Sequence, residues 1–353
     1  METAQGIKLQ RRSGTKVRLI FVMFVFLLAF FFVLDLFLGS VNIKPADVIS
    51  SFFGNAGSDI RTIIMQFRLP KAVTSVFVGM ALSLSGLQMQ AIFRNPLAGP
   101  YVLGVSSGAS LGVAIVILGF SGSVVTAGIG GFGNWILVVS AWVGAGMVMM
   151  LIMFISSRLS DIMTILILGI MLASGLSAIV TIMQYFSSES MLKAYVIWTM
   201  GSLGNLSSGQ LKVLVISVSA GVLLSILTIK RLNAFLLGEN YAGSMGMNVK
   251  SSRTIIFACT SILAGSVTAF CGPIGFIGIA VPHLVRNIFR TSDHAILVPG
   301  SILAGGIVMT VSDIISQLPG SERLLPINSV TSLIGIPVVI WIILRKRNNT
   351  AMF

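Results

Sequence analysis

The sequence is long, apolar and poor in charge. It has 353 residues, of which 55% are hydrophobic and 9% are charged, and its mean hydropathy is +0.99. Water-soluble domains carry about 25% charged residues, because their surface must be hydrated. The composition therefore excludes a soluble globular protein of this size and indicates a protein that lies in a lipid bilayer.

The basic excess raises the question of nucleic-acid binding, since the formal net charge is +13 at pH 7. The basic residues cluster in the first 18 residues, after the last apolar segment and between apolar segments. This distribution is typical of loops that are held on the cytoplasmic side of a membrane. No surface pattern interleaves these charges with aromatic residues, so we expect membrane lipid, and no nucleic acid, around this chain.

Ten apolar segments follow one another, each ended by glycine, proline, asparagine or charge. The first, residues 19–39, is long enough to cross the hydrocarbon core and lacks a following cleavage site, so we expect it to be retained. The sequence therefore predicts an all-α, polytopic protein of about ten transmembrane helices, with one membrane domain over residues 1–353. The other nine segments cover residues 70–93, 101–120, 135–155, 162–186, 211–229, 254–270, 276–289, 295–315 and 327–344.

Ten crossings return both termini to the same side of the membrane. With the basic segment 1–18 in the cytoplasm, sixteen of the 23 lysine and arginine residues fall inside. Cytoplasmic loops carry such an excess, so we expect a multi-pass protein of the cell (inner or plasma) membrane with both termini cytoplasmic. The basic residues left outside are Lys44, Arg61, Arg68, Lys71, Lys193, Lys212 and Arg323.

Several kinds of catalytic machinery are missing from the sequence. It has no GxxxxGK[ST] phosphate loop, and its two histidines, His283 and His294, are too far apart for an HExxH metal site. An intramembrane serine protease would need a base within the bilayer, and for His283, which follows Pro282, a structural role is favoured. The two cysteines, Cys259 and Cys271, form neither a disulfide framework nor a zinc ligand set. We therefore expect no catalytic residue, cofactor or metal site, and no enzyme activity.

The acidic residues address a second alternative, an ion-coupled secondary transporter. Such transporters place carboxylates or histidines near the membrane midplane to bind the coupling ion. The acids within apolar segments, Asp35 and Asp313, are expected near the outer ends of the first and ninth helices. Transport energy is therefore expected to come from another subunit, and the secondary transporter stays the alternative.

Small residues predict where helices approach closely. Gly104, Gly108 and Gly112 fall on one face of the third apolar segment, and in lipid such residues let helix backbones pack together. Packing within the chain is favoured over a dimer contact.

Two unusual motifs predict breaks in the helices. The first covers residues 68–109, in which Pro96 and Pro100 remove backbone donors and interrupt the chain between the second and third helices. The second covers residues 270–286 and begins with a break at the outer end of the seventh helix. Irregular backbone at membrane depth must be buried in protein or line a wet cavity. The motif residues assigned to these breaks and to the pathway are Arg94, Asn95, Pro96, Gly272, Pro273, Pro282 and His283.

From about residue 60 to its end, the chain resembles the FecCD family of ABC importer permeases, which serve ferric siderophores, haem and cobalamin. The resemblance implies a permease with type II ABC importer architecture that acts with a second copy or a paralogue. It also implies two cytoplasmic ATPase subunits and an extracytoplasmic substrate-binding protein. We rank a ferric siderophore first as cargo, on family frequency, with haem or cobalamin next.

The longest predicted cytoplasmic loop, residues 231–253, resembles the coupling loop of ABC permeases, whose short helices enter a cleft of the ATPase. Its small residues at one-turn spacing suit close docking, and coupling is favoured over a merely solvated loop. The residues assigned to coupling are Gly238, Glu239, Ala242 and Gly246.

Two basic residues, Arg68 and Lys71, flank a proline at the predicted outer start of the second helix. The resemblance implies that residues at these positions meet acidic side chains of the binding protein, and contact with lipid headgroups is the alternative. The family often has a further arginine after the ninth helix and Glu-Leu-Pro-x-Gly before the tenth, and the present sequence departs from both patterns at residues 312–317 and 324–328. A third basic docking contact is therefore expected only if Arg323 replaces it.

Overall fold

The computed structural model describes residues 2–39, 41–54, 57–119, 133–159, 161–317 and 324–350. In these ranges the chain forms helices and connecting turns, without a strand. Seven of the described helices are long and apolar enough to span a bilayer, and three shorter apolar helices accompany them. These helices correspond to the ten predicted segments, so the all-α, multi-spanning fold is confirmed. They are α1 (Glu2–Phe37), α4 (Leu69–Ile92), α5 (Val105–Ala114), α7 (Gly133–Arg158), α8 (Ile162–Tyr185), α10 (Ser208–Leu227), α13 (Val249–Cys271), α14 (Ile277–Phe289), α15 (His294–Ser316) and α16 (Ile327–Thr350).

Several spans begin at other residues than predicted, among them α1, which begins at Glu2, and α13, which begins at Val249. The second begins earlier, because α3 (Ser58–Thr62) and a π-helical turn, η1 (Ile63–Arg68), run directly into α4. The third begins later, at Val105, because the proline-rich connection of residues 93–104 is not helical. It then continues past α5 as a second π-helical turn, η2 (Ile115–Gly119).

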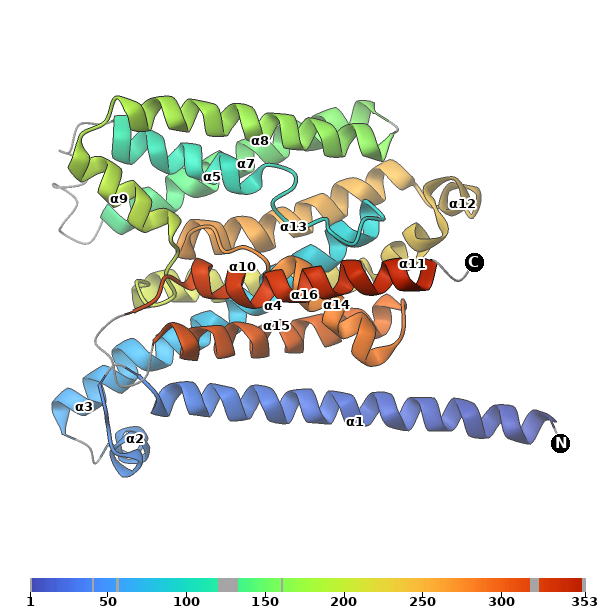
Figure 1. Cartoon of the computed structure of the whole chain (residues 1–353), viewed down its shortest axis with the longest axis horizontal. Helices are drawn as coiled ribbons and strands as arrows, with labels where there is room; N and C mark the ends of the chain where they lie inside the picture. Colours follow the sequence, from blue (N-terminus) through green and yellow to red (C-terminus); the bar gives the residue numbers. More distant parts are fainter. Residues whose placement is uncertain are drawn as a thin grey trace.

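Short helices lie at both ends of the bundle (Figure 1). At one end are α2 (Pro45–Phe52), α3 and α9 (Glu189–Thr199). At the other end are α11 (Ile229–Leu237) and α12 (Glu239–Ser244), together with both chain termini. The termini therefore share a side with the predicted coupling loop, as an even number of crossings requires. By the predicted topology, the end with α11 and α12 is called the inner end and the opposite one the outer end.

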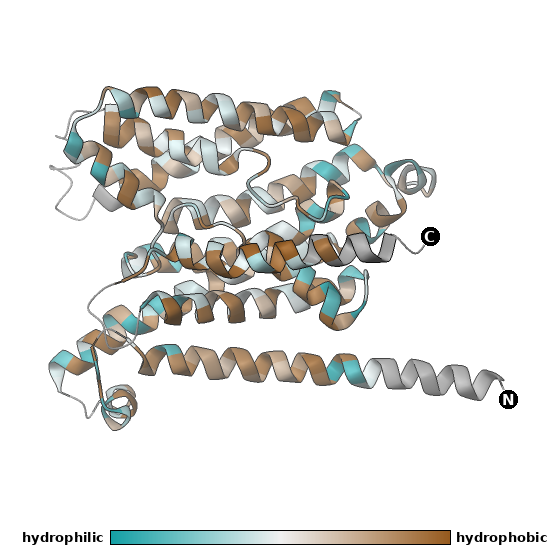
Figure 2. Ribbon diagram, viewed as in Figure 1, coloured by the Kyte–Doolittle hydropathy of each residue, from teal (hydrophilic) through white to brown (hydrophobic). Residues whose placement is uncertain are grey.

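The bundle has a buried centre and two exposed edges. About three quarters of the apolar windows of α4 and α13 are buried, at 78% and 72%, against 17% for α1 and for α8. Figure 1 shows α4 and α13 within the bundle and α1 and α8 along opposite edges. The residues of α8 and of α1 from Gly14 onward are mostly hydrophobic (Figure 2). Apolar exposure of this extent suits contact with lipid or with another membrane helix.

The glycine stripe of the third segment packs within the chain, as predicted. A Cβ atom added at Gly112 would lie 2.1 Å from the carbonyl oxygen of Ser140, and one at Gly108 would lie 2.5 Å from that of Gly144. Both partners belong to α7, so α5 and α7 are in backbone contact. No side chain larger than hydrogen fits at either position without moving one helix.

Candidate functional site

The two sequence motifs meet between α4 and α14. A Cβ atom at Gly86 would lie only 1.8 Å from the carbonyl oxygen of Gly278, so the two helices touch through their backbones. Four residues further along α4, the Nε2 of Gln90 donates to the carbonyl oxygen of Ile279 at 3.1 Å. A guanidinium nitrogen of Arg286 in turn donates to the Oε1 of Gln90. The motifs are thus two sides of one helix contact.

Pro282 contributes to this contact because it has no backbone N–H. It lies inside α14, and because proline has no backbone N–H, it cannot donate to the carbonyl of Gly278 one turn earlier. That carbonyl faces α4, where Gln90 Nε2 approaches it at 3.5 Å. The proline therefore leaves an acceptor available where the two motifs meet.

The break between α4 and α5 is stabilised by side chains of both motifs. Arg94 has a positive φ of 48°, and the Oδ1 of Asn95 accepts a hydrogen bond from the backbone N–H of Leu97 at 2.9 Å. The Nε2 of His283 lies 3.0 Å from the carbonyl oxygen of Pro96 and must carry the proton to donate to it. This contact gives His283 a structural role at the break, the one favoured from the sequence.

The outer break follows the end of α13. Gly272 has a φ of 75°, which favours glycine, and a Cβ atom there would lie 2.6 Å from the carbonyl oxygen of Trp198. Pro273 comes next, and the N–H of Gly275 donates to Asn328 Oδ1 at 3.0 Å. The turn therefore connects α13 with the end of α9 and the start of α16.

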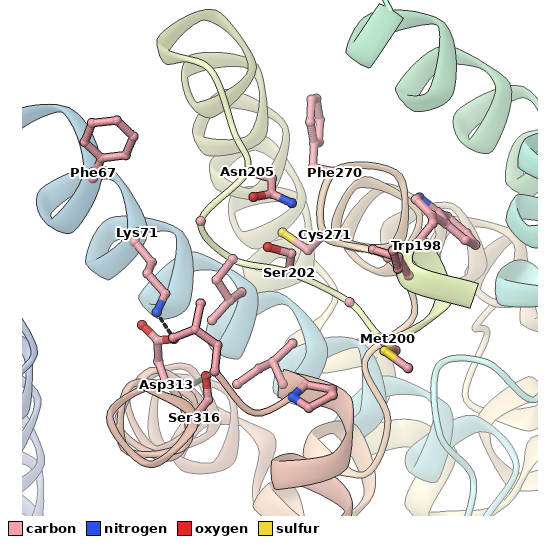
Figure 3. A pocket seen from close by; sticks show the side chains of 18 of the residues that line it. Phe67, Lys71, Trp198, Met200, Ser202, Asn205, Phe270, Cys271, Asp313 and Ser316 are labelled. Atoms are coloured by element: carbon pink, nitrogen blue, oxygen red, sulfur yellow. Dashed lines mark ion pairs between the residues drawn. The ribbon is translucent and has the colours of Figure 1, made fainter. Parts of the chain in front are cut away.

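A cavity of about 950 Å³ lies beside this turn at the outer end. Its wall is mostly apolar and includes Phe67, Trp198 and Phe270. Figure 3 shows Trp198, Met200, Phe270 and Cys271 on one side and the charged pair of Lys71 and Asp313, with Phe67 near Lys71, on the other. A cavity of this kind is suited to an apolar or amphipathic guest with few fixed charges.

The charged side of the cavity is a buried network of α1, α4 and α15. The Nζ of Lys71 lies 2.9 Å from Asp313 Oδ1, and the Asp313 side chain is 1% exposed. Gln317 Nε2 donates to Asp35 Oδ1 at 2.8 Å and to Asp313 Oδ2 at 3.3 Å. Both acids lie at the outer end, as the sequence predicted, but their link through Gln317 and Lys71 was not predicted.

Arg68 is directed at the backbone of the first helix. One terminal nitrogen donates to the carbonyl oxygens of Leu36 and Phe37 at 2.9 and 3.0 Å, and the other donates to that of Val41. Arg68 is 9% exposed and joins the end of α1 to the last residue of η1, directly before α4. Arg68 and Lys71 thus both have partners within the chain, and their role in docking a binding protein stays a prediction. Arg323 lies outside the described residues.

The predicted coupling residues fall into two groups. Ala242 is fully buried, and Glu239 forms an ion pair with Arg253, with Nη2 2.7 Å from Oε1. Gly238 is also buried, whereas Gly246 is exposed, with a φ of 87° and open space around its Cα. Of the four predicted residues, only Gly246 therefore presents an open surface.

The exposed face of this segment is apolar and was missed from the sequence. Leu237, Tyr241 and Met245 are 58%, 55% and 55% exposed. Tyr241 and Met245 are one helical turn apart, and this spacing is the signal that could have revealed them, whereas Leu237 ends α11 before the break at Gly238. With Gly246 they form the surface that we call the inner apolar face.

The chain is similar to known proteins over most of its length. The model of the FecCD transport family matches residues 27–345, which include both motifs, the outer cavity and the α11–α12 segment. The chain belongs to the FecCD transport family.

Curated relatives and a solved structure support the assignment over most of the chain. The hemin transport system permease protein HmuU of Yersinia pestis is 34% identical over 81% of this chain and 84% of its own length. The vitamin B12 import system permease protein BtuC of Citrobacter koseri is 34% identical over 89% of this chain and 91% of its own. A metal-chelate type ABC transporter, solved in an inward-facing conformation, superimposes with a TM-score of 0.79 and 27% identity, covering 92% of this chain and 99% of that one.

These relatives are permease subunits, which carry out transport and are not enzymes. The interpretation of this FecCD chain as a multi-pass membrane permease of an ABC importer is therefore confirmed.

Proposed function

We propose that this permease carries a metal chelate into the cytoplasm, with a ferric siderophore ranked first and haem or cobalamin next. The observation that carries the proposal is the family match together with permeases named for hemin and vitamin B12 among the relatives. The largely apolar outer cavity supports it, and the described residues hold no cluster of metal-ligating side chains. An organic chelator already supplies the ligands of its metal, so the passage needs an apolar wall and no metal-ligating side chains.

The transport pathway is proposed to run between this chain and a second copy or paralogue. The support comes from α8, which is a long apolar helix with little contact to its own chain. It also exposes small and hydroxyl residues in its middle, among them Ser174, Gly175, Ser177 and Thr181. Such residues suit a facing helix or a wet passage better than lipid tails.

Two further partners complete the proposal. The inner apolar face offers a docking surface for a separate ATPase subunit, one for each permease. The outer end, with α2, α3, α9 and the cavity, is assigned to an extracytoplasmic substrate-binding protein. Both termini are then cytoplasmic, since they lie at the same end as α11 and α12 (Figure 1).

An ion-coupled secondary transporter is the weaker alternative. The buried acids Asp35 and Asp313 lie together at the outer end, where Lys71 pairs with Asp313 and Arg68 is nearby. Two acids beside two bases leave no net negative charge for a coupling ion. Such an ion would also need ligands near the midplane.

The proposal is tested by transport into liposomes. The permease is reconstituted with and without its ATPase, and uptake of a ferric siderophore, hemin, cobalamin and free ferrous ion is measured. We expect uptake of one chelate that requires ATP, the ATPase and a binding protein. Uptake that needs only a proton or sodium gradient would establish the alternative, and uptake of free ferrous ion alone would refute the chelate assignment.

A further inference from the structure

The α11–α12 segment is held to the membrane helices by three polar contacts, which we call the anchoring contacts. The first comes from the break after α4. A terminal nitrogen of Arg94 donates to the carbonyl oxygen of Leu236 at 2.9 Å. This bond joins the last turn of α11 to the inner end of α4.

The second anchoring contact joins α11 to the start of α15. Asn233 Nδ2 donates to Asp293 Oδ1 at 2.7 Å, and Asn233 Oδ1 accepts from the backbone N–H of His294 at 2.8 Å. The buried His294 ring adds its Nδ1, also 2.8 Å from Asn233 Oδ1. Asp293 caps α15 through the N–H of Ala295, and this bond, followed by that of Asn233, holds the pKa of Asp293 below its ordinary value. Asn233 therefore contacts the capping residue Asp293 and both the backbone N–H and the imidazole ring of His294, the first residue of α15.

The third anchoring contact joins α12 to the start of α13. Arg253 Nη2 lies 2.7 and 2.8 Å from the two carboxylate oxygens of Glu239, and the Arg253 side chain is 1% exposed. Arg253 Nη1 also donates to the carbonyl oxygen of Leu159, between α7 and α8, at 3.3 Å. The same guanidinium thus connects α12, α13 and the α7–α8 connection. Removing the carboxylate would leave a buried cation without its acid, which is strongly unfavourable.

The helices that the anchoring contacts reach at the inner end, α4, α13 and α15, also border the cavity at the outer end. Lys71 of α4, Cys271 of α13 and Asp313 of α15 all line it. Along their length, α4 and α15 touch through their backbones, since a Cβ atom at Gly79 would lie 2.1 Å from the carbonyl oxygen of Gly305. Such close packing resists independent movement of the two helices, and packed rigid elements are the kind of structure through which distant sites are coupled.

We infer that the anchoring contacts transmit movement of the ATPase-bound segment to α4, α13 and α15, and that Glu239 and Asn233 are positioning residues for this coupling. This inference rests on the proposed function. The inner apolar face and the anchoring contacts use different side chains: Leu237, Tyr241 and Met245 are exposed, whereas Glu239 and Asn233 are directed at the bundle. Binding of the ATPase and transmission of its movement are therefore separable by mutation.

The test uses the complete complex of permease, ATPase and binding protein in liposomes. Glu239→Gln and Asn233→Ala are compared with Asn240→Ala, a matched control at an exposed position on α12. Two quantities are measured, which are the ATPase that copurifies with the permease and the chelate transported per ATP hydrolysed. We expect both variants to retain the wild-type amount of ATPase while transport per ATP falls by roughly tenfold, the scale of an energetic coupling between sites. The control is expected to match wild type.

A conservative variant separates coupling from general folding. Glu239→Asp keeps the negative charge opposite Arg253 and is expected to recover much of the transport per ATP that Glu239→Gln loses. If Glu239→Gln and Asn233→Ala both keep the wild-type ratio, the inference is wrong. It is equally wrong if either variant loses the ATPase on purification, because those residues are then docking contacts. A wild-type complex without ATP-dependent uptake would instead refute the proposed function.

Discussion

Gly86 of α4 and Gly278 of α14 are in backbone contact, so that any Cβ atom at Gly86 would lie 1.8 Å from the carbonyl oxygen of Gly278. This is far inside van der Waals distance, and the obstacle is backbone, which cannot rotate away. The contact brings together the two motifs through glycines that are almost two hundred positions apart in the sequence. In lipid, where apolar burial does not drive helix association, close backbone packing of this kind stabilises the bundle.

Gly86→Ala is expected to destabilise the permease, because α14 must move to admit the methyl group. Overpacking in a well-packed interior costs about 1–3 kcal/mol. The measurement is the thermal unfolding of the purified protein in detergent. The control is Gly146→Ala on α7, where an added Cβ atom meets no other atom within 4 Å. Equal unfolding temperatures for the two variants would show that the contact is looser than the structure indicates.

Lys71→Met is expected to destabilise the outer end of the bundle, because it leaves the Asp313 carboxylate, which is 1% exposed, without its ion-pair partner. Breaking a buried ion pair costs about 3–5 kcal/mol, and the partial exposure of Lys71 places the expected value at the lower end. Adding Asp313→Asn to Lys71→Met should restore much of the loss, since the uncompensated charge is then gone. Thermal unfolding of the single and double variants measures this coupling.

The matched control is Lys212→Met, which removes an exposed lysine from the outer start of α10. It should leave the unfolding temperature unchanged. If Lys71→Met also leaves it unchanged but abolishes stimulation of the ATPase by the binding protein, the main role of Lys71 is the predicted docking contact.

The helices could be predicted from the sequence because each depends on a local property. An apolar run of sufficient length must form a helix in lipid, since no other open structure satisfies its backbone. The late start of the third span follows from residues 93–104, where Pro96 and Pro100 do not continue a helix. The two breaks were predicted for the same local reason, whereas the contact between the two motifs was not predicted.

The cross-helix contacts could not be predicted in this way. Asp35, Lys71 and Asp313 each stand alone in the sequence, and only the packing of α1, α4 and α15 brings them together. The orientation of the α11–α12 segment could not be predicted from spacing either. Ala242 is buried and Glu239 is paired with Arg253, because that side of α12 faces the bundle, and the assignment of both residues to coupling stays a prediction.

The orientation in the membrane is testable by thiol labelling. Ser208→Cys at the outer start of α10 should react with a membrane-impermeant maleimide in intact cells, and Ser251→Cys at the start of α13 should react only after permeabilisation. Both positions are exposed, and the native Cys259 and Cys271 are buried, so the background should be low. Ser207 is unsuitable, since its side chain caps α10. Labelling of Ser251→Cys in intact cells would contradict cytoplasmic termini.

Gly246→Trp is expected to prevent ATPase docking. Gly246 lies in open space beside Met245 on the inner apolar face, so an indole ring would project into the volume assigned to the partner. Its positive φ of 87° adds a separate effect, because a side chain there strains the backbone. Gly246→Asn separates the two effects, since asparagine tolerates positive φ better than other residues and is much smaller than tryptophan. We expect the permease to insert in the membrane in both variants and to copurify with the ATPase only in Gly246→Asn. Copurification with Gly246→Trp at the wild-type ratio would remove this surface from the docking site, and loss in both variants would assign the effect to the backbone.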